Sequence, residues 1–233
     1  MTEPSFPPLF TGEAVRGDPF AAACARAAAG CDAGLITYRP APERLEAAIV
    51  FAPEVPLADA VLALPVCGIG FQNALGALAP PSVGVYLGWN GDIRVNGGLC
   101  GRLRMAADTR DPQTVPGWLV IGLDLIAVDA TEDPGVTPDT TALYNEGCGD
   151  IELPQLLEAW ARHTLVWLGR WEDEGVRPIH KEWIGIAHGI DEQVTQGGVT
   201  GTFTGVDERL GMLLKSGDTT RLIPLTELLE DPA

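Results

Sequence analysis

The sequence predicts an α+β fold: a mixed β-sheet flanked by helices, followed by a small C-terminal β-barrel. Three observations lead to this prediction. Helical segments are few and lie far apart, at residues 19–29, 63–78 and 154–171. Between residues 83 and 128 the predicted strands follow one another directly, which favours a mixed or antiparallel sheet over a doubly wound parallel one. After residue 183, short apolar runs alternate with turn residues about every 8–12 positions, a spacing typical of small β-barrels.

The ends of two helices are marked by characteristic residues. Asp18 is the expected N-cap of the first helix, Pro19 occupies its first position, and Gly30 stops its Ala-rich body. In the helix at residues 154–171, Leu and Trp residues recur at helical spacing, and Gly175 follows its end. We interpret this aromatic stripe as core packing and not as a binding surface.

The strands are predicted from short apolar runs that lie between turn residues. Asn96-Gly97 is the strongest hairpin signal, because a type I′ turn needs a positive φ at both central residues. Irregular structure is expected at residues 1–17 and in a loop at residues 39–45. The predicted strands are residues 34–38, 47–52, 83–89, 93–95, 98–106, 118–128, 183–187, 199–206, 210–215 and 221–225.

The domain organisation follows from the change in strand spacing. An acidic loop rich in Pro and Gly is expected at residues 129–150. We place the domain boundary near residue 176. Residues 1–175 are then the larger domain, and residues 176–233 are a small SH3-like β domain.

Composition and charge argue against several classes of partner. The formal net charge is −17 and the 15 Lys and Arg residues are scattered, so nucleic acid is not an expected partner. No apolar run reaches about 18 residues without Gly, Pro or charge, so neither a membrane span nor a membrane partner is expected. The five cysteines form no C-x-x-C pair and are interpreted as buried reduced thiols. Because the start of the chain shows no secretory signal, a cytoplasmic location is expected.

Motifs of common catalytic sites are missing from the sequence. His163, His180 and His188 show no spacing suited to metal ligands, so no metal is expected. There is no G-x-S-x-G elbow and no G-x-x-x-x-G-K-[ST] loop, which argues against a hydrolase and against a P-loop nucleotide site. Residues 68–73, G-I-G-F-Q-N, match a dinucleotide fingerprint only in part, and we interpret them as small residues that let a helix pack closely.

One block of the chain carries a family resemblance. Residues 86–105 resemble the strand–loop–hairpin of the biotin/lipoate protein ligase family. Trp89 and Asp92 fall on the Trp and Asp of the family's K-W-P-N-D motif. Residues 98–103, G-L-C-G-R-L, fall on its K-[LV]-A-G-I-L strand.

Two further segments extend this resemblance over roughly residues 10–230. Residues 120–123 are similar to the family's V-I-G-[IL] strand, and residues 201–214 are similar to its SH3-like C-terminal domain. The resemblance implies the fold of a biotin ligase catalytic domain, of the class II aminoacyl-tRNA synthetase type. It also implies an ATP-dependent ligase that forms an acyl-adenylate and transfers biotin, lipoate or another acyl group to a protein lysine. ATP and biotin or lipoate would be needed only if that activity is retained.

The chain departs from the family at positions that carry its chemistry. The family grips its ligand with a Gly- and Arg-rich loop, whereas residues 39–45 have no glycine and only Arg39 and Arg44. Two lysines of the family motifs fall on Gly88 and Gly98. Adenylation builds charge on phosphoryl oxygens and needs positioned cations. We therefore assign no catalytic residue and treat Gly88 and Gly98 as degenerate positions.

A cation moved along one strand would compensate in part for these losses. Gly98 and Arg102 lie on the same face of a strand if no bulge intervenes, because side chains alternate with period 2. Arg102 would then face a small carboxylate across the space left by Gly98. The alternatives are that Arg102 extends to the surface, or that Asp92 or Asp124 neutralises it. The candidate ligand-binding residues are Tyr38, Arg39, Trp89, Asp92, Cys100, Gly101 and Arg102.

Two classes of function remain open from the sequence. The first is a divergent family member with lost or altered ligase chemistry, which binds a small carboxylate or acyl ligand or a partner protein. The alternative is an active ligase or acyltransferase. The sequence names neither the acyl group, nor a partner protein, nor the oligomeric state.

Overall fold

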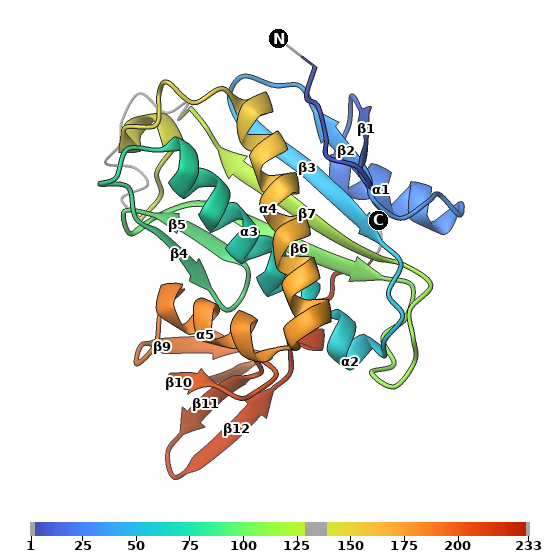
Figure 1. Ribbon diagram of the computed structural model, residues 1–233. Coiled ribbons are helices and arrows are strands. Elements are labelled where there is room, and N and C mark those ends of the chain that lie inside the picture. The colour runs from blue at the N-terminus through green and yellow to red at the C-terminus, as the bar shows by residue number, and fades with distance from the viewer. Residues whose placement is uncertain (1–2, 129–138, 232–233) are drawn as a thin grey trace.

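The computed structural model describes residues 3–128 and 139–231 (Figure 1). Its centre is an eight-stranded sheet made of β1 (Thr11–Ala14), β2 (Leu35–Arg39), β3 (Arg44–Phe51), β4 (Val85–Gly88), β5 (Asp92–Val95), β6 (Gly98–Ala107), β7 (Leu119–Ile126) and β8 (Ala187–His188). The strand order is β1-β2-β3-β7-β6-β5-β4-β8. Neighbours are antiparallel except for the edge pairs β1–β2 and β4–β8, which are parallel. The expected mixed sheet is confirmed.

Local sequence signals fix most of the strand ends. The turn between β5 and β6 lies at Asn96 and Gly97, whose φ angles of 50° and 94° are the positive values that the hairpin needs. The loop expected at residues 39–45 is shorter than predicted, because Arg39 still belongs to β2 and Arg44 already belongs to β3. A further difference is β1, which lies in a stretch expected to be irregular and pairs with β2.

Helices cover both faces of the sheet. They are α1 (Pro19–Ala28), α2 (Leu57–Ala60), α3 (Ala63–Leu78), α4 (Leu153–Glu174), α5 (Arg177–Ile186) and the 3-10 helices η2 (Leu143–Glu146) and η3 (Leu225–Leu228). α3 and α4 pack together over one face, where the larger core lies, and α1 packs on the opposite face (Figure 1). Alternate residues of β3 separate the two faces: Ile49 belongs to the larger core, whereas Ala48 and Val50 lie under α1.

The first helix is built as the sequence predicts. The Asp18 side chain accepts a hydrogen bond from the backbone N–H of Phe20 at 2.8 Å, and Pro19 opens the helix. Gly30 follows the helix with a φ of 85°, a value that favours glycine. Asp18 and Phe20 are thereby held over the sheet.

One segment of the described chain, Leu57–Leu78, is long and apolar enough to cross a membrane. It covers α2 and α3, and 72% of its apolar window is buried inside the protein. This burial is the arrangement of a core helix, and it agrees with the place of α3 between the sheet and α4.

The C-terminal part forms a separate four-stranded antiparallel sheet (Figure 1). Its order is β12-β11-β10-β9, so strands adjacent in sequence are adjacent in space. This sheet is consistent with the expected small C-terminal domain, and an SH3-like closure stays a prediction. The strands are β9 (Gln193–Gln196), β10 (Val199–Val206), β11 (Met212–Ser216) and β12 (Thr219–Ile223).

The segment that joins the two sheets differs from the prediction. The strand expected at residues 183–187 is wrong, because residues up to Ile186 belong to α5. Ile179 and Trp183 are buried one helical turn apart, and α5 packs on α3 and α4, so burial of an apolar helical face decides the structure. β8 then extends the edge of the large sheet, although residues 176–233 were expected to form a small β domain of their own. The domain boundary near residue 176 stays a prediction.

Candidate functional site

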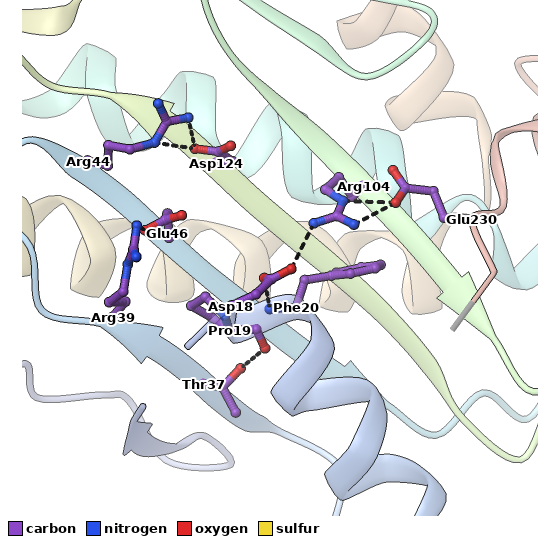
Figure 2. Close-up of polar contacts among 10 residues, drawn as sticks. All are labelled: Asp18, Pro19, Phe20, Thr37, Arg39, Arg44, Glu46, Arg104, Asp124 and Glu230. Atoms are coloured by element: carbon purple, nitrogen blue, oxygen red, sulfur yellow. Dashed lines mark hydrogen bonds and ion pairs between the residues drawn. The ribbon is translucent and has the colours of Figure 1, made fainter. Parts of the chain in front are cut away.

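A polar cavity of about 280 Å³ lies on the face of the sheet that α1 only partly covers. It forms where the N-terminus of α1 meets β2, β3, β6 and β7 (Figure 2). The side chains in it come from segments far apart in sequence but adjacent in the sheet. The cavity is lined by Asp18, Pro19, Phe20, Arg39, Glu46, Ala47, Arg104, Gly122, Leu123 and Asp124.

Two arginines of the cavity region are paired within the sheet. Arg39 and Glu46 are direct cross-strand neighbours on β2 and β3, and their side chains form an ion pair. Arg44 donates from Nε and Nη2 to Oδ1 of Asp124, at 3.1 and 2.5 Å. Because both partners of each pair are anchored in strands, these cations are fixed in place by the fold.

The third arginine, Arg104 of β6, is held by groups from both ends of the chain (Figure 2). Its Nε and Nη2 donate to Oε2 of Glu230 at 2.9 and 2.7 Å, and Nη1 donates to Asp18 at 3.3 Å. The guanidinium also lies 4.2 Å from the centre of the Phe20 ring, a cation–π contact. The hydrogen bonds to Glu230 raise the pKa of Arg104, so its charge is stabilised here.

The C-terminal tail brings Glu230 to this position. The backbone N–H of Glu230 donates to the carbonyl of Met105 at 2.7 Å, and Leu229 forms a β-bridge with Met105. Arg110 donates to the carbonyl of Leu229 at 3.2 Å. The tail therefore lies along β6 and brings a carboxylate to Arg104.

The charges of the site are balanced internally. The guanidiniums of Arg39, Arg44 and Arg104 face the carboxylates of Asp18, Glu46, Asp124 and Glu230. Every arginine of this cluster has a carboxylate partner. The resting site thus offers no uncompensated cation for a phosphate group. Among the described residues, no group of three or more His, Cys, Asp and Glu side chains is placed to hold a metal ion.

Two glycines allow close packing at the site. A Cβ at Gly122 would lie 2.6 Å from a ring carbon of Phe20, so this glycine lets α1 approach β7. A Cβ at Gly101 would lie 2.8 Å from the Cα of Leu125 on the neighbouring strand. Gly101, a candidate ligand contact, therefore has a packing role in the sheet.

The condition on which Arg102 was expected to face the space at Gly98, a strand without a bulge, is not met. A β-bulge intervenes, since Ile93 lies opposite Gly101 while the next residue of β5, Arg94, lies opposite Leu99. The period-2 argument that placed Gly98 and Arg102 on one face therefore fails. Arg102 is exposed and does not line the polar cavity.

Asp92 and Asp124 were the expected neutralising partners of Arg102, and within the described residues neither forms an ion pair with it. Asp124 binds Arg44, and Asp92 accepts no hydrogen bond or ion pair from Arg102 within the part of the chain that the structure describes. Asp92 does lie opposite Arg102 in the β5–β6 register. A ligand contact by Asp92 stays a prediction.

The space over Gly98 is filled by the protein itself. A Cβ at Gly98 would lie 2.8 Å from Cγ2 of Thr141, whose backbone N–H donates to the carbonyl of Leu99. The Thr141 hydroxyl donates to Glu146 at 2.5 Å, which fixes the side chain. The resemblance places a lysine at Gly98, and such a side chain could enter only if residues 139–141 moved. At Gly88 a Cβ would lie 2.7 Å from Oδ1 of Asn90, so this position is also crowded.

The remaining candidate residues lie in the core or at the contact between the large sheet and the C-terminal part. Trp89 is buried and donates from Nε1 to the carbonyl of Leu210 at 2.7 Å, which ties the large sheet to the C-terminal part. Tyr38 lies on the other face and lines a separate cavity beside α4. Cys100 is buried, and burial raises the pKa of its thiol to about 12. Of the seven candidates, only Arg39 lines the polar cavity.

Most of the residues that build this cavity were not predicted from the sequence. Asp18 was predicted only as a helix cap, and Phe20, Glu46 and Arg104 were not singled out. The period-2 pattern of β6 could have marked Arg104 as a second arginine on the face of Arg102. No local signal connects Arg104 with Glu230, which is 126 residues away.

Comparison with known families defines the class of protein. Residues 6–185 match the Biotin/lipoate A/B protein ligase family, and residues 190–231 match a domain of unknown function, DUF4444. The chain belongs to the biotin/lipoate A/B protein ligase family. The curated proteins gave no match.

Solved structures agree with this assignment. A biotin protein ligase-like protein of unknown function from Silicibacter sp. TM1040 is 58% identical, with a TM-score of 0.92 over 97% of this chain and 99% of that one. The apo biotin protein ligase of Aquifex aeolicus is 16% identical, with a TM-score of 0.73 over 93% and 95% of the two chains. The Leishmania major ligase in complex with biotinyl-5-AMP is also 16% identical, with a TM-score of 0.55 over 93% and 98%. The two ligases share the fold of this chain.

Proposed function

We propose that this protein is a family member that binds a small carboxylate without activating it as an adenylate. The observation that carries the proposal is that the site's arginines are each neutralised by an internal carboxylate. Adenylation places a phosphoryl group in the site and depends on cations aimed at it. Here the Glu46 and Asp124 carboxylates already occupy Arg39 and Arg44, and they are part of the sheet.

Arg104 is the cation that a ligand could use. Its strongest partner, Glu230, belongs to the C-terminal tail and not to a strand of the large sheet. The two side chains are 22% and 35% exposed, and a pair of this kind contributes roughly 0–1 kcal/mol. A ligand carboxylate could therefore replace Glu230 at small cost, with bidentate hydrogen bonds to the planar guanidinium.

The cavity suits a small ligand in shape as well as charge. Phe20 packs over Gly122 at the wall of the cavity, and Ala47 and Leu123 also line it. The volume of about 280 Å³ corresponds to the lower end of small-molecule sites. The protein is proposed to act in the cytoplasm, and its five free cysteines support a reducing compartment.

Binding is tested by thermal shift with octanoate, lipoate and biotin, each against its methyl ester or amide. We expect one or more of the free acids to raise Tm and the uncharged derivatives to have no effect. Arg104→Gln should abolish the shift. Arg102→Gln is the matched control, because Arg102 lies two residues away on β6 and outside the cavity, and it should leave the shift unchanged. A shift that survives Arg104→Gln would contradict the proposal.

Catalysis is tested by ATP–pyrophosphate exchange with biotin, lipoate or octanoate. We expect no exchange above the rate without acid. Exchange at about 1 per second or faster, an ordinary enzymatic turnover, would establish the alternative, an active ligase. The two assays are separate, so binding without exchange supports the proposal as a whole.

A further inference from the structure

Another cavity lies at the C-terminal end of α4, away from the polar cavity. Its volume is about 640 Å³, within the usual range for small-molecule sites. It forms between the C-terminal end of α4, the end of β3, α2 and the segment that joins β3 to α2. It shares no lining residue with the polar cavity, so a role for it stands apart from the proposed function. The lining residues are Ala33, Phe51, Ala52, Pro53, Glu54, Val55, Asp59, Ala60, Leu62, Ala63, Leu119, Leu168, Trp171, Glu172 and Val176.

The walls of this cavity are apolar and accessible. Phe51 closes it from the end of β3, and Leu168 and Trp171 face it from adjacent turns of α4. These three side chains are half-buried, so they pack on the core on one side and meet solvent on the other. Aromatic surface of this kind binds the apolar body of a ligand, and the face of Trp attracts cations.

All charged groups that line the cavity are acidic. Glu54 and Glu172 are exposed, and neither forms a hydrogen bond or an ion pair within the described residues. Asp59 lies 3.5 Å from Arg209, which is itself outside the lining. The cavity wall includes no Lys, Arg or His among its described residues.

The end of α4 adds to the negative potential. Glu172, Asp173 and Glu174 occupy its last turn, where the helix dipole is already negative and where cations are normally favoured. Within residues 3–128 and 139–231, Glu174 is the one member of this turn with an ion pair, which it forms with Arg170 at 3.2 Å. Negative charge is therefore concentrated beside an apolar surface, a combination that helix stability does not favour.

We propose that this cavity binds an organic cation with an apolar body. The ammonium group lies between Glu54 and Glu172, and the apolar part packs against Phe51 and Trp171. The two unpaired carboxylates supply the charge complement, and the volume favours a small molecule over an extended chain. An anion of the same shape would be repelled by three carboxylates.

The test uses three probes that each carry a phenyl ring on a four-carbon chain: 4-phenylbutylamine, 4-phenylbutyrate and 4-phenyl-1-butanol. Binding is followed by ¹H–¹⁵N spectra of the tryptophan indoles, with the Trp171 signal assigned from Trp171→Phe. We expect the amine to shift the Trp171 signal and to bind about 10-fold or more tightly than the butyrate. Added salt should weaken binding of the amine and leave the alcohol unaffected.

Variants that remove one carboxylate at a time test whether Glu54 and Glu172 bind the ammonium group. Glu54→Gln and Glu172→Gln should each weaken amine binding by about 3-fold, as expected for exposed charge pairs. Glu174→Gln is the matched control, because Glu174 is in the same helical turn, pairs with Arg170 and does not line the cavity. It should change the affinity by less than about 1.5-fold.

Several outcomes would overturn the proposal. They are equal binding of the three probes, no detectable binding of the amine, a shift at other tryptophans without Trp171, or equal effects of Glu172→Gln and Glu174→Gln. Each of these leaves the octanoate, lipoate and biotin assays untouched, because the two cavities share no residue.

Discussion

The two faces of the large sheet differ in how they are covered: helices bury one face fully, and the other is partly open and charged. On the face of α3 and α4, helices of 16 and 22 residues cover the strands with a continuous apolar core. On the opposite face α1 has 10 residues, about 15 Å of helix, and leaves part of the sheet open. The open part carries arginines and carboxylates in pairs.

The two faces contribute differently to the stability of the fold. A well-packed apolar face contributes most of the free energy of folding, since each fully buried large side chain contributes about 1.5–3 kcal/mol. The charged pairs on the other face are partly exposed, and each contributes little. We propose that the open part of the α1 face is available for a ligand, because its ion pairs contribute little to the stability of the fold. The following predictions test that contrast, from the largest expected effect to the smallest.

The α3–α4 face should be sensitive to loss of volume. Trp160 of α4 is fully buried and donates from Nε1 to the carbonyl of Cys67 at 3.0 Å. Trp160→Ala should lower the free energy of unfolding by about 3–5 kcal/mol, measured by urea denaturation. Val166→Ala on the same helix is the control, because Val166 is 58% exposed, and it should stay within about 0.5 kcal/mol. A cost for Trp160→Ala below that of Val166→Ala would remove the contrast.

Glycine substitutions should have opposite signs at two positions. Gly122→Ala places a methyl group against the Phe20 ring and should cost about 1–3 kcal/mol. Gly169→Ala, in the middle of α4 with open space around its Cβ, should stabilise the protein by about 0.5–1 kcal/mol. Both are measured by thermal and urea unfolding. If Gly122→Ala had no effect on stability, α1 would not be held against β7 as the structure shows.

The ion pairs of the polar cavity should matter little to stability. Arg104→Gln breaks the contacts to Glu230 and Asp18 and should cost about 1 kcal/mol. Arg102→Gln, on the exposed part of the same strand, should stay within about 0.5 kcal/mol. Urea denaturation of both variants and of Glu230→Gln checks this. A cost for Arg104→Gln as large as that for Trp160→Ala would mean that the α1 face is structural.

The smallest effect concerns the pH dependence on the α4 side. Burial, with a smaller contribution from Arg162, lowers the pKa of His163 below its usual 6.5. The unfolded chain then binds this proton more readily than the folded one, so the contribution of His163 is complete above about pH 6.5 and declines as the pH falls below it. His163→Gln should reduce the loss of stability between pH 7 and pH 5.5, measured by urea denaturation across that range. An unchanged pH dependence would show that this histidine is solvated in the folded protein.

The sequence-based predictions succeeded where signals are local. The hairpin at Asn96-Gly97, the capped start of α1 at Asp18 and the apolar spacing of α4 all hold in the structure. Each depends on backbone preferences or periodicity within a few residues. The family motifs also lay in such local segments, which is why their order was readable without the structure.

The shared face of Gly98 and Arg102 was expected on the condition that no bulge intervenes, and the structure has one inserted residue there. The bulge in β6 breaks the alternation between Gly98 and Arg102, and period-2 reasoning has no signal for it. The strand expected at residues 183–187 failed for a related reason. Buried Ile179 and Trp183 select a helix there through packing on α3 and α4.

The sequence by itself determined the class of fold, the main elements and the family, because these follow from local propensity, apolar periodicity and the order of motifs. The tertiary structure decided which charges meet and which spaces are filled. Glu230 reaches Arg104 across 126 residues, and Thr141 fills the space over Gly98. Ion pairing and steric filling depend on distances in space, and the sequence separation of such residues carries no periodic pattern from which those distances could be inferred.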